Sequence, residues 1–371
     1  MDRNTVRVLE LDGGGTRGIF SMKGLASIIG GYPEIDGGAL SQLFDVITGT
    51  SIGGICAVGL CCGKSPQELY QMIYDNAYDI FDASWWAFGD HKATNADMGS
   101  YVTGIQPALY YTSGTDPYEN TPLKTLISSI VGDKTILDIK DTVLIIPVVE
   151  YVPPEESGHM RYRLVSNLVT PWSTQTYADY DRDDHGNPKK DAAGNFIIIH
   201  QPWTLLDLCM ATSAAPMYLP QWKVGKDLYI DGGLVQNNMS PFALEVGQSL
   251  KTNSMRSCLL SIGTGLRDAG GNQEGEANDA FAGFFQLSNA LGNSLTLHQE
   301  FGDEMLNIRT SNSRRHFYKY RFNTFFRKDK SALCDLDSSS KESLDYMTGV
   351  ANTLYQNDLT KIKQFMDHLL L

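Results

Sequence analysis

The chain has 371 residues, six of them cysteines, and a formal net charge of −13. A chain of this length can bury a large core, and its negative field opposes contact with nucleic-acid polymers and with anionic lipid surfaces. Its apolar stretches fall far below the roughly 20 residues of a membrane span, so we expect only peripheral, local membrane contact. No CxxC pair and no secretory signal are present, so we expect reduced thiols in a cytoplasmic protein.

Strand and helix patterns alternate along the chain, which is typical of an α/β fold whose functional groups gather at the carboxyl ends of its strands. Apolar runs predict strands at residues 6–11, 44–47, 142–149, 228–231, 258–262 and 317–322. Helical spacing predicts helices at residues 19–29, 55–62, 66–81, 241–250 and 281–301, followed by an amphipathic helical region at 344–369.

The first predicted strand runs directly into the sequence DGGGTRG at residues 12–18. Consecutive glycines before a helix leave backbone amides that can bind an anion. The run lacks the lysine of a phosphate-binding loop and the acidic residue of a dinucleotide fold. We therefore interpret the amides of Gly13, Gly14 and Gly15 as an oxyanion hole, because a developing alkoxide needs fixed donors nearby.

The sequence GTSIG at residues 49–53 follows the second predicted strand and precedes a helix. Gly49 and Gly53 let the chain turn sharply, which holds the Ser51 hydroxyl clear of the backbone at the start of that helix. Ser51 is therefore the candidate nucleophile. Because a GxSxG sequence alone is weak evidence, this interpretation depends on the neighbouring motifs.

An irregular insertion at residues 82–122 contains Trp85, Trp86 and Phe88. Indole rings favour the boundary between polar and apolar phases, which predicts a mobile lid or a membrane-contacting edge here. The alternative is that these rings pack a cap onto the core, because buried tryptophan is common.

An acidic segment at residues 179–190 raises the question of a calcium site. An EF-hand that begins at Asp179 would need glycine where Asp184 stands and glutamate where Lys190 stands. We therefore expect a solvated loop there, and we predict neither a metal nor a resident cofactor.

A third motif, DGG at residues 231–233, ends an apolar strand, and Gly232 helps to leave Asp231 uncrowded. DGGGxRG, GxSxG and DGG in this order resemble the patatin-like phospholipase family, as does the segment ATSAAPMYLP at residues 211–220. The resemblance spans about residues 6–265. It implies a three-layer α/β fold with a central, mostly parallel sheet. One domain is expected over residues 1–371, with a lid-like insertion at about 82–122 and a helical elaboration at about 266–371.

The resemblance also implies a lipid acyl hydrolase with a Ser/Asp dyad: Ser51 as nucleophile, Asp231 as its base, and the three loop glycines as the oxyanion hole. A carboxylate with a reference pKa near 3.9 is a weak base toward an alcohol. We therefore expect burial to raise the pKa of Asp231, or the oxyanion hole to supply most of the stabilisation. Arg17 occupies the family's basic position and is expected either near the oxyanion or as an exposed cation that completes the loop.

Two other functions stay open. A Ser-His-Asp hydrolase of the ordinary α/β type would use His298, His316 or His368 as its base, although no histidine lies in a motif. A regulatory lipid-binding protein would use the pocket as a sensor, although it would have no chemical need for both Ser51 and Asp231.

The family includes bacterial effector lipases that wait for an activator, since a lipase with free access to its host's membranes would be self-destructive. This resemblance implies membrane phospholipid or another acyl lipid as substrate, with peripheral membrane contact. It also implies an activating nucleotide or protein as a partner. An effector of this kind would be secreted by a route that needs no signal peptide.

Overall fold

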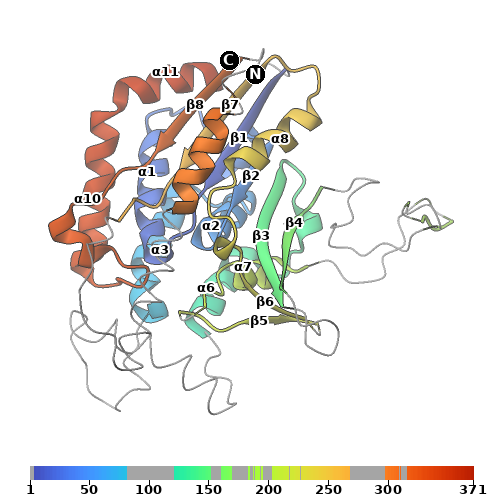
Figure 1. Ribbon diagram of the computed structural model, residues 1–371, viewed down its shortest axis with the longest axis horizontal. Coiled ribbons are helices and arrows are strands. Elements are labelled where there is room, and N and C mark those ends of the chain that lie inside the picture. Colours follow the sequence, from blue (N-terminus) through green and yellow to red (C-terminus); the bar gives the residue numbers. More distant parts are fainter. Residues whose placement is uncertain are drawn as a thin grey trace, which may run out of the picture.

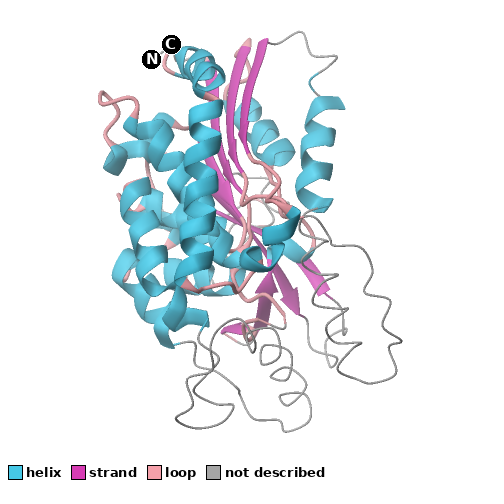
Figure 2. Ribbon diagram, turned by 90° about the vertical axis from the view of Figure 1, so that its left-hand side faces the viewer, coloured by secondary structure: helices cyan, strands magenta, loops and turns pink. Residues whose placement is uncertain are grey.

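A mixed β-sheet runs through the middle of the protein in the computed structural model, and helices cover both of its faces (Figure 1, Figure 2). The structure describes residues 4–81, 121–151, 160–168, 183, 187, 189–192, 194, 203–216, 218–225, 227–267, 297–308, 310 and 316–371. The strands are β1 (Thr5–Leu11), β2 (Val46–Gly49), β3 (Val143–Tyr151), β4 (Met160–Ser166), β5 (Trp222–Val224), β6 (Asp227–Asp231), β7 (Arg256–Ile262) and β8 (His316–Phe322).

Within these residues, eight strands form one sheet in the order β5-β6-β3-β2-β1-β7-β8, and β4 pairs with β3 beside this path. From β3 through β2, β1 and β7 to β8 the strands are parallel, whereas β4, β5 and β6 pair in antiparallel fashion. Every residue of β1 and β2 is buried, as expected of parallel strands that are covered on both faces. The predicted α/β fold with a central, mostly parallel sheet is therefore confirmed.

Helices form the two outer layers. One layer contains α1, α3, α10 and α11, and the other contains α8 (Figure 1). The helices are α1 (Gly18–Gly30), α2 (Ile52–Cys61), α3 (Pro66–Phe81), α6 (Thr121–Val131), α7 (Leu205–Thr212), α8 (Ser240–Leu250), α10 (Lys341–Asn357), α11 (Leu359–Leu369) and residues 297–308. Short 3-10 helices are η1 (Gly15–Arg17), η2 (Gly37–Leu43), η3 (Ile136–Asp138), η4 (Gly232–Leu234) and η5 (Lys328–Cys334).

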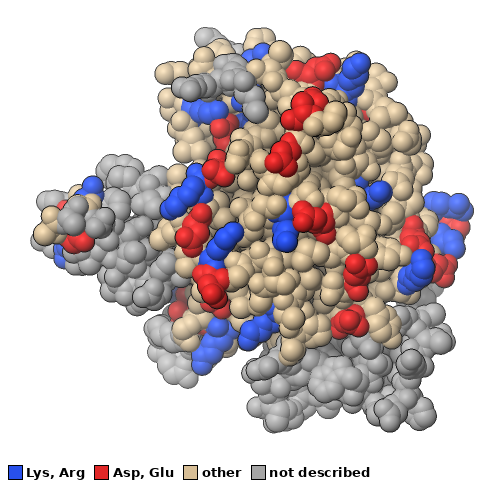
Figure 3. Space-filling model, turned by 180° about the vertical axis from the view of Figure 1, so that it is seen from behind, with Lys and Arg blue, Asp and Glu red and all other residues tan. Residues whose placement is uncertain are grey.

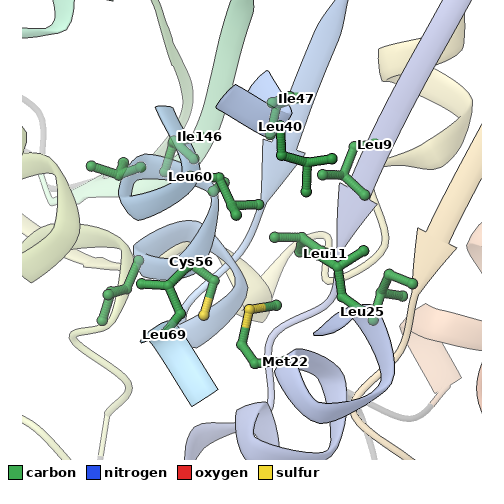
Figure 4. Packing of buried hydrophobic residues seen from close by; sticks show 14 of the residues in the cluster. Leu9, Leu11, Met22, Leu25, Leu40, Ile47, Cys56, Leu60, Leu69 and Ile146 are labelled. Carbon is green, nitrogen blue, oxygen red and sulfur yellow. The ribbon is translucent and has the colours of Figure 1, made fainter. Parts of the chain in front are cut away.

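Alternation along β1 divides the hydrophobic core in two. Leu9 and Leu11 face the larger cluster, where Leu11 lies beside Leu25 of α1 (Figure 4). Val6 and Val8 face the smaller cluster under α8. Packing on both faces therefore fixes the carboxyl end of β1, which is where the DGGGTRG loop begins.

Most predicted elements are present with small shifts of their ends; the helix predicted at 55–62, for example, spans Ile52–Cys61. Two helices, α6 and α7, were not predicted. With eight residues, α7 is too short for periodicity to identify, whereas the buried residues of α6 do follow helical spacing. Residues 82–120 of the predicted insertion lie outside the described residues, and so do Asp179 and Asp184. The helix predicted at 281–301 is described from residue 297 and continues to residue 308.

Among the described helices, none combines the length and the hydropathy that crossing a bilayer requires. On the face seen in Figure 3, basic and acidic side chains of the described residues are interspersed, so the negative net charge is not gathered there into one patch. All six cysteines are free, and four of them are buried.

The packing of α1 on β8 yields a stability prediction. A Cβ atom on Gly24, in the middle of α1, would stand 2.1 Å from the ring of the fully buried Phe322. Alanine usually stabilises a helix interior by about 1 kcal/mol relative to glycine, but overpacking typically costs about 1–3 kcal/mol. We expect Gly24→Ala to lower the free energy of unfolding in urea. Gly30 of the same helix is the control, because its Cβ would meet nothing within 4 Å; equal effects of the two substitutions would contradict the prediction.

Candidate active site

The turn between β2 and α2 presents Ser51. Its backbone has φ 56° and ψ −127°, and it is the one non-glycine residue with positive φ in the described part of the chain. Such a conformation costs about 1–3 kcal/mol and persists only where the surrounding structure enforces it. The strain therefore lies at the predicted nucleophile, at the kind of sharp strand-to-helix turn that exposes a serine hydroxyl.

Two close backbone contacts explain the glycines on either side of Ser51. A Cβ atom on Gly49 would lie 2.3 Å from the Gly53 carbonyl oxygen, and one on Gly53 would lie 2.3 Å from the Leu11 carbonyl oxygen. Real Cβ atoms essentially never approach other atoms so closely, so both positions require glycine for reasons of space. The contact with Leu11 also seats the turn directly on the end of β1.

Asp231 is the last residue of β6 and is only 4% exposed. Its Oδ1 atom accepts a 2.7 Å hydrogen bond from the Gly233 amide, and a Cβ atom on Gly232 would lie 2.5 Å from the Pro147 carbonyl oxygen. Burial raises the pKa of Asp231 to about 7, even though hydrogen bonds with the Ser51 hydroxyl and the Gly233 amide act to lower it. A carboxylate with this pKa is matched to proton transfer near neutral pH, so the burial that such a base was expected to need is present.

The three glycines after β1 differ in their hydrogen bonds. The Gly13 amide donates to Asn237 Oδ1 at 2.9 Å, and Asn237 Nδ2 donates back to the Gly13 carbonyl oxygen at 3.1 Å. The amides of Gly14 and Gly15 donate to no acceptor within the described residues, and both residues line a cavity together with Ser51. Of the three amides predicted for the oxyanion hole, that of Gly13 is therefore engaged, whereas those of Gly14 and Gly15 are available to a ligand.

Arg17 is 2% exposed, which excludes the alternative of an exposed cation. Its Nε atom donates to the Gly14 carbonyl oxygen at 3.3 Å, and its Nη1 atom donates to the Gly265 carbonyl oxygen at 3.2 Å. Burial lowers the pKa of the guanidinium. The side chain therefore ties the glycine loop to the turn after β7.

A buried cluster of charges lies at the base of the same loop. Arg321 of β8 pairs with the carboxylates of Asp12 and Glu10, the latter at 3.4 Å, and its Nε atom lies 3.2 Å from Asp303 Oδ2. Burial raises the pKa of both Glu10 and Asp12, whereas the positive charge of Arg321 lowers it. The cluster joins β8 and the helix at residues 297–308 to the end of β1. Motif reasoning missed it, because Arg321 is 309 positions away from Asp12 along the chain.

An apolar pocket reaches the site, and its empty space is about 900 Å³ when the part open to solvent is included. Ser51, Asp231, Gly14 and Gly15 line it, and most of its other lining side chains are apolar. Helices α3 and α6 contribute several of these side chains, among them Leu69, Ile73, Leu123, Leu126 and Ile130. The cavity can therefore receive an apolar chain next to the serine.

Within the described residues, none of the three candidate histidines hydrogen-bonds to Ser51 or Asp231. His298 Nδ1 is 3.1 Å from the Gly233 carbonyl oxygen. His316 begins β8, at the amino end of a strand that is parallel to β7, whereas the dyad lies at the carboxyl edge. His368 stacks on Tyr318 with ring centroids 3.8 Å apart. None of the three lines the cavity that Ser51 and Asp231 share.

No group of three or more His, Cys, Asp and Glu residues in the described ranges is arranged to hold a metal ion. Trp85, Trp86 and Phe88 lie outside the described residues, so their role at a lid or membrane edge stays a prediction.

Two buried polar residues of the site were not singled out by motif. Asn237 follows DGG by only a few positions, in the sequence QNN, and Thr212 lies in the segment ATSAAPMYLP. Thr212 contacts the Ser51 backbone amide. For Asn237 the available signal was its closeness along the chain to Asp231, and for Thr212 it was its place in the segment that resembles the family.

Comparisons with known proteins agree with the motifs. The family model described as patatin-like phospholipase matches residues 9–243. A cGAMP-activated phospholipase of Escherichia coli (strain TW11681) is 32% identical over 275 residues, which cover 71% of this chain and 63% of that protein. A cGAMP-activated phospholipase of Vibrio cholerae serotype O1 is 33% identical over 258 residues, covering 68% and 60%. The match thus spans less than two thirds of the length of these two relatives. A cGAMP-activated phospholipase of Pseudomonas aeruginosa is 24% identical over 352 residues, covering 94% of this chain and 86% of that protein.

The raised pKa of Asp231 predicts that this carboxyl destabilises the protein at high pH. Since its pKa rises from the usual 3.8 to about 7 on folding, the folded state binds more protons between these values, and stability falls as the pH rises through them. Asp231→Asn should remove this dependence. The free energy of unfolding of Asp231→Asn in urea, relative to that of wild type, should be higher at pH 8 than at pH 5.5. The expected difference is roughly 2 kcal/mol, since one pKa unit corresponds to about 1.36 kcal/mol. Asp133→Asn, at an exposed residue, is the control. A stability difference between Asp231→Asn and wild type that does not change with pH would refute the prediction.

Proposed function

The chain belongs to the patatin-like phospholipase family, and from this premise we propose that it hydrolyses acyl esters of lipids with Ser51 as nucleophile and Asp231 as its base. The observation that carries the proposal is the buried Asp231 carboxylate, which has a pKa of about 7 and is hydrogen-bonded to a serine in a strained turn. Both groups line one apolar cavity.

The chemistry proceeds by acyl transfer. Asp231 accepts the Ser51 proton as Oγ attacks the ester carbonyl, and the amides of Gly14 and Gly15 stabilise the oxyanion. The C–O bond to the alcohol then breaks, and the leaving alkoxide takes the proton from Asp231. Water, deprotonated by the same carboxylate, attacks the acyl-enzyme and releases a fatty acid and the free serine.

The cavity supports a lipid as the substrate. Its lining beyond the dyad is mostly apolar, which suits a fatty acyl chain rather than a polar group. Since acyl lipids are held in membranes, the proposal includes peripheral membrane contact. The head group is expected to be that of a membrane phospholipid, in keeping with the family.

The relatives support a regulated enzyme. Three of them are named cGAMP-activated phospholipases, and the P. aeruginosa protein matches 94% of this chain. We therefore propose a cyclic dinucleotide of the cGAMP type as the activating partner. Such control is consistent with a protein that acts in the cytoplasm beside membranes it must otherwise spare.

The dyad yields the first functional prediction. Ser51→Ala and Asp231→Asn should each reduce hydrolysis of phospholipid vesicles and of a short soluble ester by at least about 10³-fold, because each removes one member of a single proton-transfer unit. For the same reason, the double variant should be no worse than either single one. Far-UV circular dichroism checks that each variant folds.

His298→Ala is the matched control, because His298 contacts the neighbouring Gly233 without belonging to the dyad. It should retain most of the activity. An inactive His298→Ala variant together with an active Asp231→Asn variant would instead identify a Ser-His-Asp hydrolase.

The activator yields the second functional prediction. Vesicle hydrolysis by the purified protein should rise at least about tenfold on addition of micromolar cGAMP, an increase that corresponds to about 1.4 kcal/mol. Linear dinucleotide is the control for nucleotide charge, and Ser51→Ala is the control for contaminating lipase. Full activity without nucleotide, unchanged by cGAMP, would exclude this form of regulation while leaving the dyad untouched.

A further inference from the structure

The last residue of α7, Thr212, has no exposed surface. Its Oγ1 atom accepts a hydrogen bond from the Ser51 backbone amide at 3.2 Å and donates one to the Pro147 carbonyl oxygen at 2.8 Å. One hydroxyl therefore connects the nucleophile turn to β3.

The Ser51 amide is a group that needs such a partner. Ser51 is the N-cap residue of α2, so its N–H has no acceptor within the helix, and a buried amide without an acceptor is costly. A strained backbone conformation persists only when contacts with neighbouring groups hold it in place. The hydrogen bond to the Thr212 hydroxyl is one of these contacts.

The same segment also contacts the dyad acid. Two residues after Thr212, the Ala214 carbonyl oxygen accepts a 3.0 Å hydrogen bond from the Asp231 amide. Pro147, the other partner of Thr212, lies against Gly232, where a Cβ atom would stand 2.5 Å from its carbonyl oxygen. Residues 212–214 therefore contact the backbones of both dyad members.

We propose that Thr212 is a positioning residue, whose hydroxyl holds the Ser51 backbone and, with the Ala214 carbonyl, sets the nucleophile relative to Asp231. The inference rests on the proposed dyad. It assigns no contact with substrate to Thr212, which acts through the orientation of Ser51 alone. Loss of the hydroxyl therefore slows the attack of Ser51 without changing how lipid binds.

The Thr212 methyl group has a separate packing role. A Cβ atom on Gly54 of α2 would lie 2.9 Å from Thr212 Cγ2, so this methyl packs directly on the helix that follows the nucleophile. Two conservative substitutions separate the roles: valine keeps the shape and removes the hydroxyl, whereas serine keeps the hydroxyl and removes the methyl.

The test compares Thr212→Val with Thr212→Ser. Each is assayed for kcat and KM on a soluble ester and for the rate at which a fluorophosphonate labels Ser51, a reaction in which the Oγ–P bond forms, fluoride leaves and the hydroxyl proton passes to Asp231. Because a lost buried hydrogen bond typically corresponds to about a tenfold change, we expect Thr212→Val to lower kcat and the labelling rate at least about tenfold. KM should stay within about twofold. Thr212→Ser should retain most of both rates.

Thr48→Val is the matched control, since Thr48 is also fully buried and its hydroxyl donates to a strand carbonyl, that of Ile145, at 2.7 Å. It should lower the melting temperature about as much as Thr212→Val and leave the labelling rate near that of wild type. Wild-type labelling by Thr212→Val would overturn the proposal. So would equal losses in the valine and serine variants, or an equal loss in Thr48→Val.

Failure of the dyad itself has a different signature. In that case wild type would not be labelled at Ser51, or Ser51→Ala would hydrolyse ester as well as wild type. The Thr212 comparison is made on a wild type that passes both checks.

Discussion

The close approach of three backbone turns at the carboxyl edge of the sheet is the constraint on which the site depends. A Cβ atom on Gly13 would lie 2.9 Å from Ser51 Cβ and 3.0 Å from the Thr50 carbonyl oxygen. Those on Gly53 and Gly232 would collide with the end of β1 and with the middle of β3. Glycine is required here mainly because neighbouring backbones occupy the space that a side chain would fill. The proposed nucleophile, base and oxyanion donors are close together because nothing separates the turns that carry them.

Side-chain and backbone groups from distant parts of the chain hold these turns in place. Arg321 pairs with Asp12 at the base of the glycine loop, and the Leu336 carbonyl oxygen accepts a 2.8 Å hydrogen bond from the Thr16 amide. Arg321 and Leu336 both lie beyond the 9–243 segment that the family model matches. The C-terminal part of the chain therefore supports the loop that is proposed to bind the oxyanion, in addition to covering the sheet.

The site stores unfavourable free energy in two forms. Ser51 occupies a strained backbone conformation, and Asp231 is held in a buried position that penalises its charge. Each feature lowers stability and each is useful for acyl transfer, because the first exposes the hydroxyl and the second makes the carboxylate a stronger base. The two large clusters of buried apolar side chains on either face of the sheet supply the stability that offsets them.

The sequence by itself determined the α/β fold class and the order of the motifs along the chain, and through these motifs it predicted Ser51 and Asp231 as the dyad, because apolar periodicity and glycine spacing are local properties of the backbone. Only the tertiary structure decided that the Gly13 amide is engaged by Asn237, that Arg17 is buried, and that Arg321 supports Asp12. It alone also placed Thr212 between the nucleophile turn and β3. These are contacts between residues far apart in the chain, and hydrogen bonding and desolvation depend on which groups the fold brings within about 3 Å of one another, which no local pattern specifies.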